Sequence, residues 1–144
     1  MASQLFIVIV GCGRLGSYLA NRLSKAGHGV VAIDVDEGAF RNLSPEYSGF
    51  RVEGDATELA VLKAAKVGNA DLVVAATRDD NINLMVAQVA RSAFSVGRVL
   101  ARVFDPNREG VYRSLGVETI CPTALAGELF LQSITAGGAG EGEP

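Results

Sequence analysis

Six residues near the N-terminus have the types and the spacing that bind phosphate groups. Residues 11–16, Gly11-Cys12-Gly13-Arg14-Leu15-Gly16, match the pattern G-x-G-x-x-G. The pattern alone is weak, because glycines gather in many loops. Here it follows the apolar run 5–10 and precedes a helical stretch, and Asp34 ends the next apolar run. This context predicts the phosphate-binding turn of a dinucleotide-binding βαβ unit.

Each position of this turn has a separate physical role. Gly11 permits the sharp turn out of the strand, Gly13 leaves room for the backbone to approach a pyrophosphate, and Gly16 allows close helix–strand packing. The free N–H groups at the helix start would face the phosphates. Arg14 can reach the same phosphates, or those held by a neighbouring subunit. The alternative for the turn is a glycine-rich loop of the fold that binds no ligand. The alternative for Arg14 is a solvated side chain in the first turn of the helix.

Polar residues that follow the later strands are candidates for the rest of a nucleotide site. Asp34, with Val35 beside it, is expected to accept hydrogen bonds from both hydroxyls of an adenosine ribose, which disfavours NADP. Asp55 is placed to accept from an adenine amino group, or else to cap the next helix. The segment 75–77 ends a strand at the switch point, so Ala76 and Thr77 would line the cleft. Thr77, with Asp80 three residues later, also predicts a capping box.

The sequence offers little acid–base chemistry to accompany this site. A dehydrogenase needs a proton donor or acceptor beside the nicotinamide, yet the only histidine, His28, is expected at the opposite end of the sheet. The pattern Tyr-x-x-x-Lys is absent. Cys12 could feel the helix dipole, but a small buried filler is the favoured role. We therefore expect no catalytic residues and no metal site. A small NAD-dependent oxidoreductase is the alternative.

Short apolar runs alternate with helical stretches along the chain, which is typical of an α/β protein with a parallel sheet. We predict a Rossmann-type, doubly wound, six-stranded parallel sheet with a C-terminal crossover helix. The predicted strands are 5–10, 30–33, 50–53, 71–76, 98–103 and 117–121. The predicted helices are 15–26, 36–43, 58–65, 77–93, 107–115 and 123–134, with Asp36 and Thr57 as predicted N-caps of the second and third. Residues 1–136 should form one domain, and 137–144 a disordered Gly/Glu tail.

The composition argues against several classes of protein, including nucleic-acid-binding, membrane-spanning and secreted proteins. The 144 residues carry a net charge of −3 with scattered Lys and Arg, which argues against nucleic-acid binding. No apolar run reaches the length of a bilayer span, no signal peptide is recognisable, and the two separate cysteines suit a reducing cytoplasm. Helices near 82–90 and 125–134 are apolar around much of their circumference, which predicts a homodimer or larger ring. Ordinary sheet-covering helices are the alternative.

Several segments together resemble the KTN/RCK family, the TrkA-N regulators of potassium conductance in Trk and Ktr transport systems. The likeness covers about residues 5–134. The Gly54-Asp55-Ala56-Thr57 segment and the pattern Thr77-x-x-Asp80-x-x-Asn83 make it more specific than the glycine turn alone. The segments that carry it are IVIVGCGRLGSYLA, VVAIDVD, GDAT, VVAATRDDNINLMVAQVAR, LARVFDP and LGVETICPT.

The resemblance implies a cytoplasmic regulatory subunit that binds NAD(H), AMP, ADP or ATP and gates a membrane K⁺ transporter. Such domains pair through their late helices and assemble into rings. Many relatives have a further regulatory domain, so a second regulatory subunit is one implied partner. A redox-sensing NAD(H)-binding module unrelated to transport is another reading. On the matching positions, Gly11, Gly13, Arg14 and Gly16 would hold the phosphates, and Asp34 would hold the ribose. Asp55 and Ala56 would hold the adenine. Thr77 would line the cleft, and Arg102 could contribute charge from across it.

Overall fold

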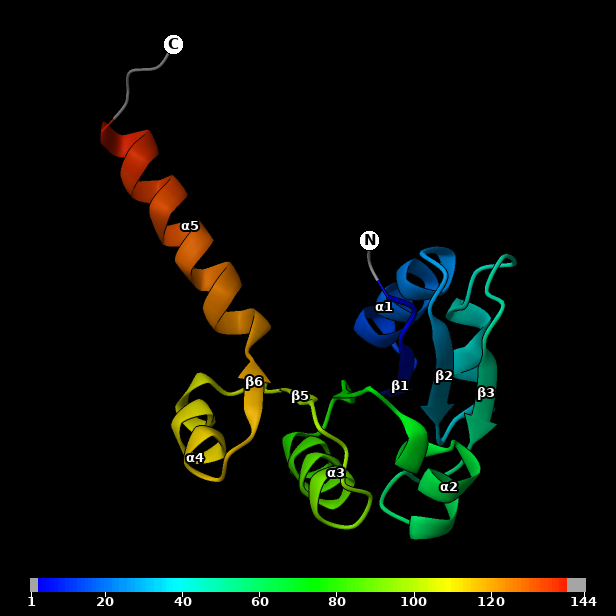
Figure 1. The fold of residues 1–144 in the computed structure, drawn as a ribbon. Helices are drawn as coiled ribbons and strands as arrows, with labels where there is room; N and C mark the ends of the chain where they lie inside the picture. Colours follow the sequence, from blue (N-terminus) through cyan, green and yellow to red (C-terminus); the bar gives the residue numbers. More distant parts are fainter. Residues whose placement is uncertain (1–2, 140–144) are drawn as a thin grey trace.

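Six parallel strands form one twisted sheet at the centre of the computed structural model, which describes residues 3–139 (Figure 1). The strand order is β3-β2-β1-β4-β5-β6. This order confirms the predicted doubly wound fold and reverses between β1 and β4, so a crevice lies at the carboxyl ends of these strands. The strands are β1 (Phe6–Val10), β2 (Gly29–Asp34), β3 (Phe50–Glu53), β4 (Leu72–Ala75), β5 (Val99–Arg102) and β6 (Glu118–Ile120).

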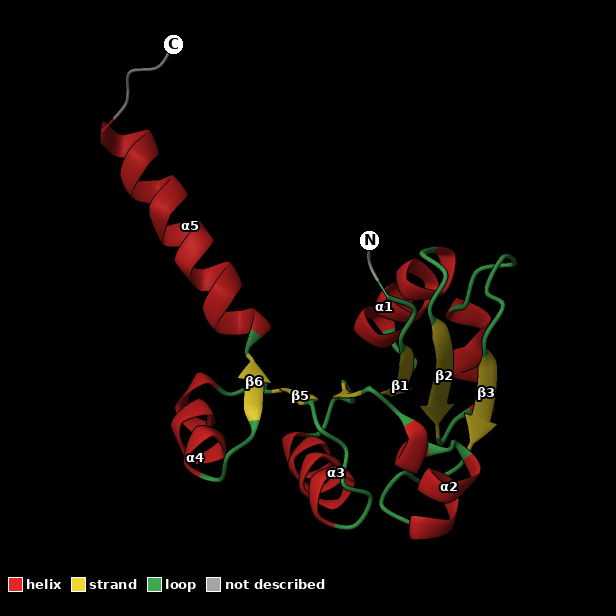
Figure 2. Cartoon of the chain, in the orientation of Figure 1, coloured by secondary structure: helices red, strands yellow, loops and turns green. Residues whose placement is uncertain are grey.

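Helices cover both faces of the sheet (Figure 2). One face carries α1 (Arg14–Lys25) and the 3-10 helix η1 (Glu37–Asn42). The other carries α2 (Leu59–Ala64), the 3-10 turn η2 (Val67–Asn69), α3 (Asp80–Ser92) and, after the 3-10 turn η3 (Pro106–Arg108), α4 (Glu109–Ser114).

The central strand β1 explains why its sequence is apolar without interruption. Its side chains alternate between the two faces: Ile7 and Ile9 pack in the core under α1, and Val8 and Val10 in the core under α2 and α3. All four are buried. A strand covered on both faces has no solvent side, so period-two alternation of polarity disappears from the sequence.

The last helix, α5 (Pro122–Ala139), leaves the body of the molecule instead of returning over the sheet (Figure 1). Residues 128–137 are all exposed. The helix is longer than predicted and includes residues 137–139, where the sequence analysis placed the start of a tail. The remainder of that predicted tail, residues 140–144, lies outside the described residues. Among residues 3–139, no helix is long and apolar enough to cross a membrane.

Two of the three predicted helix caps are wrong. Asp36 caps η1 as expected, its Oδ1 accepting from the Gly38 amide at 2.9 Å. Thr57 caps nothing, because its hydroxyl donates to Asp55. Thr77 does not cap α3; Asp79 does, with Oδ1 accepting from the amides of residues 81 and 82.

Candidate functional site

The glycine turn between β1 and α1 has the geometry that its three glycines predict. Gly11 has φ +103°, a backbone conformation that side chains disfavour. A Cβ on Gly16 would lie 1.7 Å from the Gly11 carbonyl oxygen, so only glycine lets α1 pack this close to β1. A Cβ on Gly13 would meet nothing within 4 Å. The space beside Gly13 is therefore open, and its backbone can be approached from the cleft.

A cavity of about 920 Å³ opens at the carboxyl ends of the strands, across the switch point between β1 and β4. Ten of the thirteen residues that the sequence analysis assigned to the site line it. These are Gly11, Gly13, Arg14, Asp34, Val35, Asp55, Ala56, Ala76, Thr77 and Arg102.

The other three assigned residues, Cys12, Leu15 and Gly16, do not line the cavity. The Cys12 side chain is buried in the core under α1, Leu15 packs against the same core, and Gly16 faces Gly11. Burial, with the Asp34 carboxylate nearby, raises the pKa of the Cys12 thiol to about 11. Cys12 is therefore the buried filler that was favoured, and it acts on the cleft only through its backbone.

Asp34 is held in a fixed orientation at the end of β2. Its Oδ2 accepts from the Cys12 amide and its Oδ1 from the Asp36 amide, both at 2.8 Å. A carboxylate oxygen has two lone pairs, so each retains one for another donor. The bond to Cys12 ties the second strand to the glycine turn, which sets the carboxylate and the turn at a constant separation.

Asp55 faces solvent at the rim of the cleft, after β3. Its Oδ1 accepts from both the hydroxyl and the amide of Thr57, at 2.7 and 2.9 Å. These two bonds, the hydroxyl's first, hold the pKa of Asp55 below its ordinary value. The second carboxylate oxygen, Oδ2, is in none of these bonds and can accept from a ligand.

The opposite wall of the cleft is built around a buried amide. Asn83 is 0% exposed, and its Oδ1 accepts from both the amide and the hydroxyl of Thr77. Its Nδ2 donates to the carbonyl oxygens of Thr77 and Arg102, each at 3.0 Å. One side chain thus joins the ends of β4 and β5 to α3. Thr77 therefore takes part in this cross-link and is not the cap of α3 that was predicted.

Arg102 brings a positive charge to this wall. Its guanidinium lies 4.2 Å from the centre of the Phe104 ring, and its Nε is buried without a hydrogen-bond partner among residues 3–139. Burial, and then the neighbouring Arg78, lower the pKa of Arg102, while Asp80 opposes them. Two adjacent guanidiniums with an unused donor are complementary to an anion.

The structure also brings residues to the cleft that the sequence analysis did not assign. Arg78 directly follows Thr77, and Phe104 lies two residues after Arg102, so closeness in sequence to an assigned position was a usable signal. Arg41 belongs to η1 and carried no such signal, because its place depends on how η1 folds back, with Nε donating to the Gly38 carbonyl. Further lining residues are Val10, Ile33, Asp36, Gly38, Ala39, Asn42, Gly54, Asp79 and Ile82.

His28 lies away from the cleft, at the start of β2, as predicted. Its Nδ1 accepts from the Leu5 amide at 3.0 Å, which joins the starts of β1 and β2. Among the residues that the structure describes, no group of three or more His, Cys, Asp and Glu side chains is arranged to hold a metal ion.

The fold and the cleft define a Rossmann-type domain with an open site at its switch point. Residues 7–122 match the TrkA-N domain, and the chain belongs to that family. It is 38% identical over 135 residues to "Trk system potassium uptake protein TrkA" of Streptomyces coelicolor, covering 94% of this chain and 60% of that protein. It is 34% identical over 130 residues to a TrkA homolog of Methanothermobacter thermautotrophicus, covering 90% and 60%. The chain therefore spans about 60% of the length of these relatives.

Solved structures share the fold at lower sequence identity. The "GsuK channel bound to NAD" aligns with a TM-score of 0.80 and 22% identity, over 96% of this chain and 24% of that one. The "Kef CTD in AMP bound form" of Shewanella denitrificans aligns with a TM-score of 0.78 and 24% identity, over 94% and 83%. These likenesses establish the fold.

Proposed function

We propose that the protein is a nucleotide-sensing regulatory module of a Trk-type potassium uptake system, on the cytoplasmic side of the membrane. The observation that carries the proposal is the open cleft between the glycine turn and Asp34, in a chain of the TrkA-N family. Relatives named as potassium uptake proteins support the transport role. Structural neighbours whose titles name NAD and AMP support an adenine nucleotide as the ligand.

The ligand would lie across the carboxyl edge of the sheet. Its phosphates meet the open backbone at Gly13 and the cation of Arg14, at the positive end of the α1 dipole. The ribose hydroxyls donate to the free lone pairs of Asp34, and the adenine sits near Asp55 and Ala56. A 2′-phosphate would meet the Asp34 carboxylate, which favours NAD(H), AMP, ADP or ATP over NADP.

The opposite wall is suited to phosphate beyond the first. Arg102 and Arg78 supply two guanidiniums that face the cleft across from the glycine turn. A ligand that carries two or more phosphates can meet the glycine turn and this wall together. A mononucleotide would engage the turn alone. Affinity for NADH or ATP above that for AMP would therefore support a role for this wall.

We propose regulation rather than catalysis. The titratable groups that line the cleft are the carboxylates of Asp34, Asp36, Asp55 and Asp79 and the guanidiniums of four arginines, 14, 41, 78 and 102. The alternative is a small NAD-dependent oxidoreductase, and a redox-sensing module unrelated to transport is a third reading. Substrate-dependent loss of NADH absorbance would favour the enzyme. A co-expressed potassium transporter whose activity is the same with and without this protein would favour the redox-sensing module.

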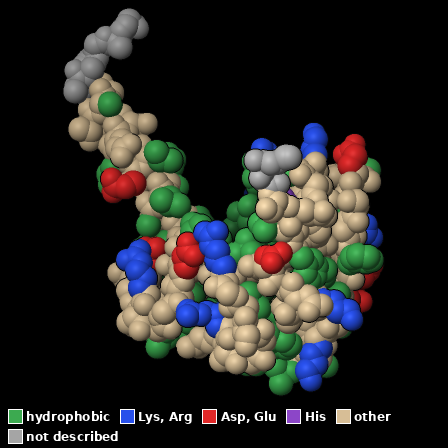
Figure 3. Space-filling model, viewed as in Figure 1, with side chains coloured by type: hydrophobic (Ala, Val, Ile, Leu, Met, Phe, Trp, Pro, Cys, Tyr) green, Lys and Arg blue, Asp and Glu red, His purple; other side chains and the backbone are tan. Residues whose placement is uncertain are grey.

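The exposed helix α5 supports assembly with a second copy, as a homodimer or larger ring. Large apolar side chains are exposed along it (Figure 3), with Leu129 and Phe130 64% and 69% exposed. On the α1 side of the sheet, Ile120 of β6 is also exposed. An identical copy brings the same apolar helix and the same strand surface, so two chains can cover each other symmetrically. A membrane K⁺ transporter subunit and a second regulatory subunit are the further proposed partners.

The mechanism is a shift in population between inter-subunit geometries. A nucleotide that binds one geometry more tightly favours it, and the assembly passes the change to the membrane partner. The size of the shift equals the difference in binding free energy between the two geometries.

Calorimetric titration with NADH, NAD⁺, AMP, ADP and ATP tests the site. We expect micromolar binding by at least one, weakened about tenfold or more in Asp34→Ala, because hydrogen bonds to a charged group contribute about 1.5–3 kcal/mol. Asp71→Ala is the matched control: Asp71 also accepts a strand amide, that of Phe6, but at the other end of the sheet. Absence of binding by all five nucleotides would overturn the proposed function.

A further inference from the structure

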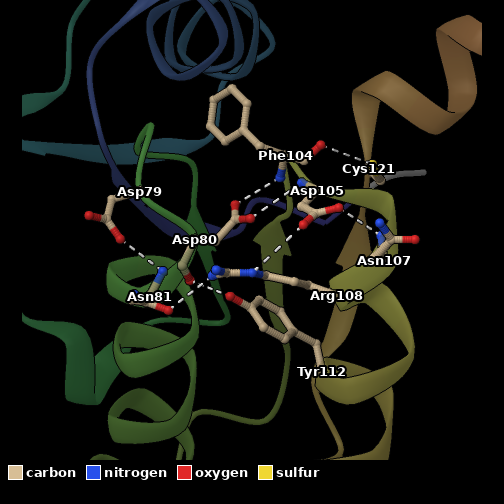
Figure 4. Close-up of polar contacts among 9 residues, drawn as sticks. All are labelled: Asp79, Asp80, Asn81, Phe104, Asp105, Asn107, Arg108, Tyr112 and Cys121. Atoms are coloured by element: carbon tan, nitrogen blue, oxygen red, sulfur yellow. Dashed lines mark hydrogen bonds and ion pairs between the residues drawn. The ribbon is translucent and has the colours of Figure 1, made fainter.

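Phe104, which forms part of the cleft wall beside Arg102, contacts Cys121, the residue that precedes α5 (Figure 4). Phe104 lines the cleft, and its ring lies under the Arg102 guanidinium. Its backbone faces away from the ligand space, toward α3 on one side and toward the start of α5 on the other. The residues that follow β5 are therefore shared between two parts of the molecule.

Asp80 holds this segment from the α3 side. Its Oδ1 accepts from the Phe104 amide at 2.7 Å and its Oδ2 from the Asp105 amide at 3.3 Å. The Tyr112 hydroxyl of α4 donates to the Asp80 carbonyl oxygen at 2.6 Å. Both carboxylate oxygens thus accept hydrogen bonds from the backbone of the segment, and Asp80 itself does not line the cleft.

Cys121 holds the same segment from the α5 side. Its thiol contacts the Phe104 carbonyl oxygen at 3.8 Å, and its sulfur accepts from the Ala124 amide at 3.4 Å in the first turn of α5. Cys121 is buried, and Ala124 packs partly against the core. Beyond Gly127 every residue of α5 to 137 is exposed. The direction of the helix is therefore set at its first turn.

We propose that Asp80 and Cys121 are positioning residues that couple occupancy of the cleft to the direction of α5. The proposal rests on the function proposed above and names how its site is read out. A phosphate that draws Arg102 toward the glycine turn removes the cation from the Phe104 ring and moves the segment after β5. The Asp80 carboxylate and the Cys121 thiol transmit that movement to α3 and to the first turn of α5, and the exposed length of α5 amplifies it.

The coupling predicts that nucleotide changes α5 although it does not touch it. Hydrogen exchange of peptides covering residues 122–135, measured in the full chain with and without saturating NADH, reports this directly. We expect a shift in exchange in the unsubstituted protein. In Asp80→Asn the amide group places an N–H donor against the Asp105 N–H, so the segment loosens. We expect NADH still to saturate the variant, with its affinity measured by calorimetry beforehand, and the shift in α5 to be lost.

Cys121→Ala provides the second variant, because it removes the sulfur without touching Asp80 or the cleft. The control is Glu109→Gln on α4, whose carboxylate pairs with Arg113 and, among the described residues, makes no hydrogen bond or ion pair to the segment after β5; it should keep the full shift. A shift in α5 that persists in both Asp80→Asn and Cys121→Ala would overturn the proposal, as would NADH binding without any shift in the unsubstituted protein. Absence of binding by all five nucleotides in calorimetry would instead overturn the proposed function and the coupling with it. If another nucleotide binds and NADH does not, that nucleotide replaces NADH in the exchange measurement.

Discussion

Helices α3 and α5 have similar sequences in one respect and opposite surroundings in the structure. Both carry apolar residues around much of their circumference. In α3, Val86, Ala87 and Ala90 are buried against the sheet. In α5, Leu129 and Phe130 are exposed, and the helix extends away from the body (Figure 1). The alternative that both are ordinary sheet-covering helices therefore holds for α3 and fails for α5.

The difference originates in the first turn of each helix. Asp79 caps α3, and Asp80 and Asn83 bond to the backbone after and at the end of β5. These directional bonds fix α3 on one face of the sheet. Among the described residues, the polar contacts of the first turn of α5 run through Cys121, which bonds to Ala124, Leu125 and the Phe104 carbonyl. These contacts lead to the segment after β5 and not to a face of the sheet. Apolar residues indicate that a helix will be covered, and polar bonds decide by which surface.

The largest expected effect breaks the attachment of α3. Asn83→Ala removes a buried side chain that makes four hydrogen bonds, and it should lower the free energy of unfolding by about 3 kcal/mol. Asn81→Ala, two residues earlier and exposed, is the control and should cost less than about 1 kcal/mol. Urea denaturation of both variants tests this. Equal losses would show that Asn83 does not anchor α3.

A second pair of variants compares the burial of the two helices directly. Val86→Ala in α3 should lower the free energy of unfolding by about 2 kcal/mol, from lost burial and the cavity it leaves. Leu129→Ala in α5 removes more carbon but should cost less than about 0.5 kcal/mol at concentrations where the chain is monomeric. Thermal unfolding at low concentration measures both. A loss at Leu129 as large as at Val86 would mean that α5 packs on its own sheet in solution.

A third variant tests what covers α5. Leu129→Glu places a charge on the surface proposed for pairing, and it should weaken self-association about tenfold or more, because burying an unpaired charge is costly. Gln88→Glu adds the same charge to the exposed side of α3 and should leave association unchanged. Sedimentation over a range of concentrations measures this. A monomer at micromolar concentration in the unsubstituted protein would refute the pairing.

The smallest effect concerns pH and the α4 contact to α3. Burial, and then the nearby Asp80, raise the pKa of Tyr112 above its ordinary value of 10.0. Below pH 10 both the folded and the unfolded chain keep the phenolic proton, and the stabilisation is complete. As the pH rises above 10, the unfolded chain releases this proton first, so stability falls. Tyr112→Phe should make this decline shallower in urea denaturations across that range; an unchanged decline would assign it to other groups.

Local signals predicted most of the fold and part of the cleft. The apolar runs and their spacing placed all six strands, and the topology then placed Asp34, Asp55 and Thr77 at one edge of the sheet. Cys12 and Leu15 were assigned by the pattern of the turn, yet their side chains face the core because successive residues of a turn point to different sides. Arg41 was missed because its position depends on tertiary packing of η1.

The sequence by itself determined the order of the elements, the glycine turn and the edge of the sheet at which a ligand can bind. These follow from short-range patterns: apolar runs bounded by glycine and polar residues, and a turn that only glycine can form. The tertiary structure alone decided that Asp79 caps α3, that Asn83 and Asp80 join α3 to β5, and that α5 extends into solvent. Those outcomes depend on which distant backbone groups come within hydrogen-bonding distance, and the spacing of residues along one chain does not encode that.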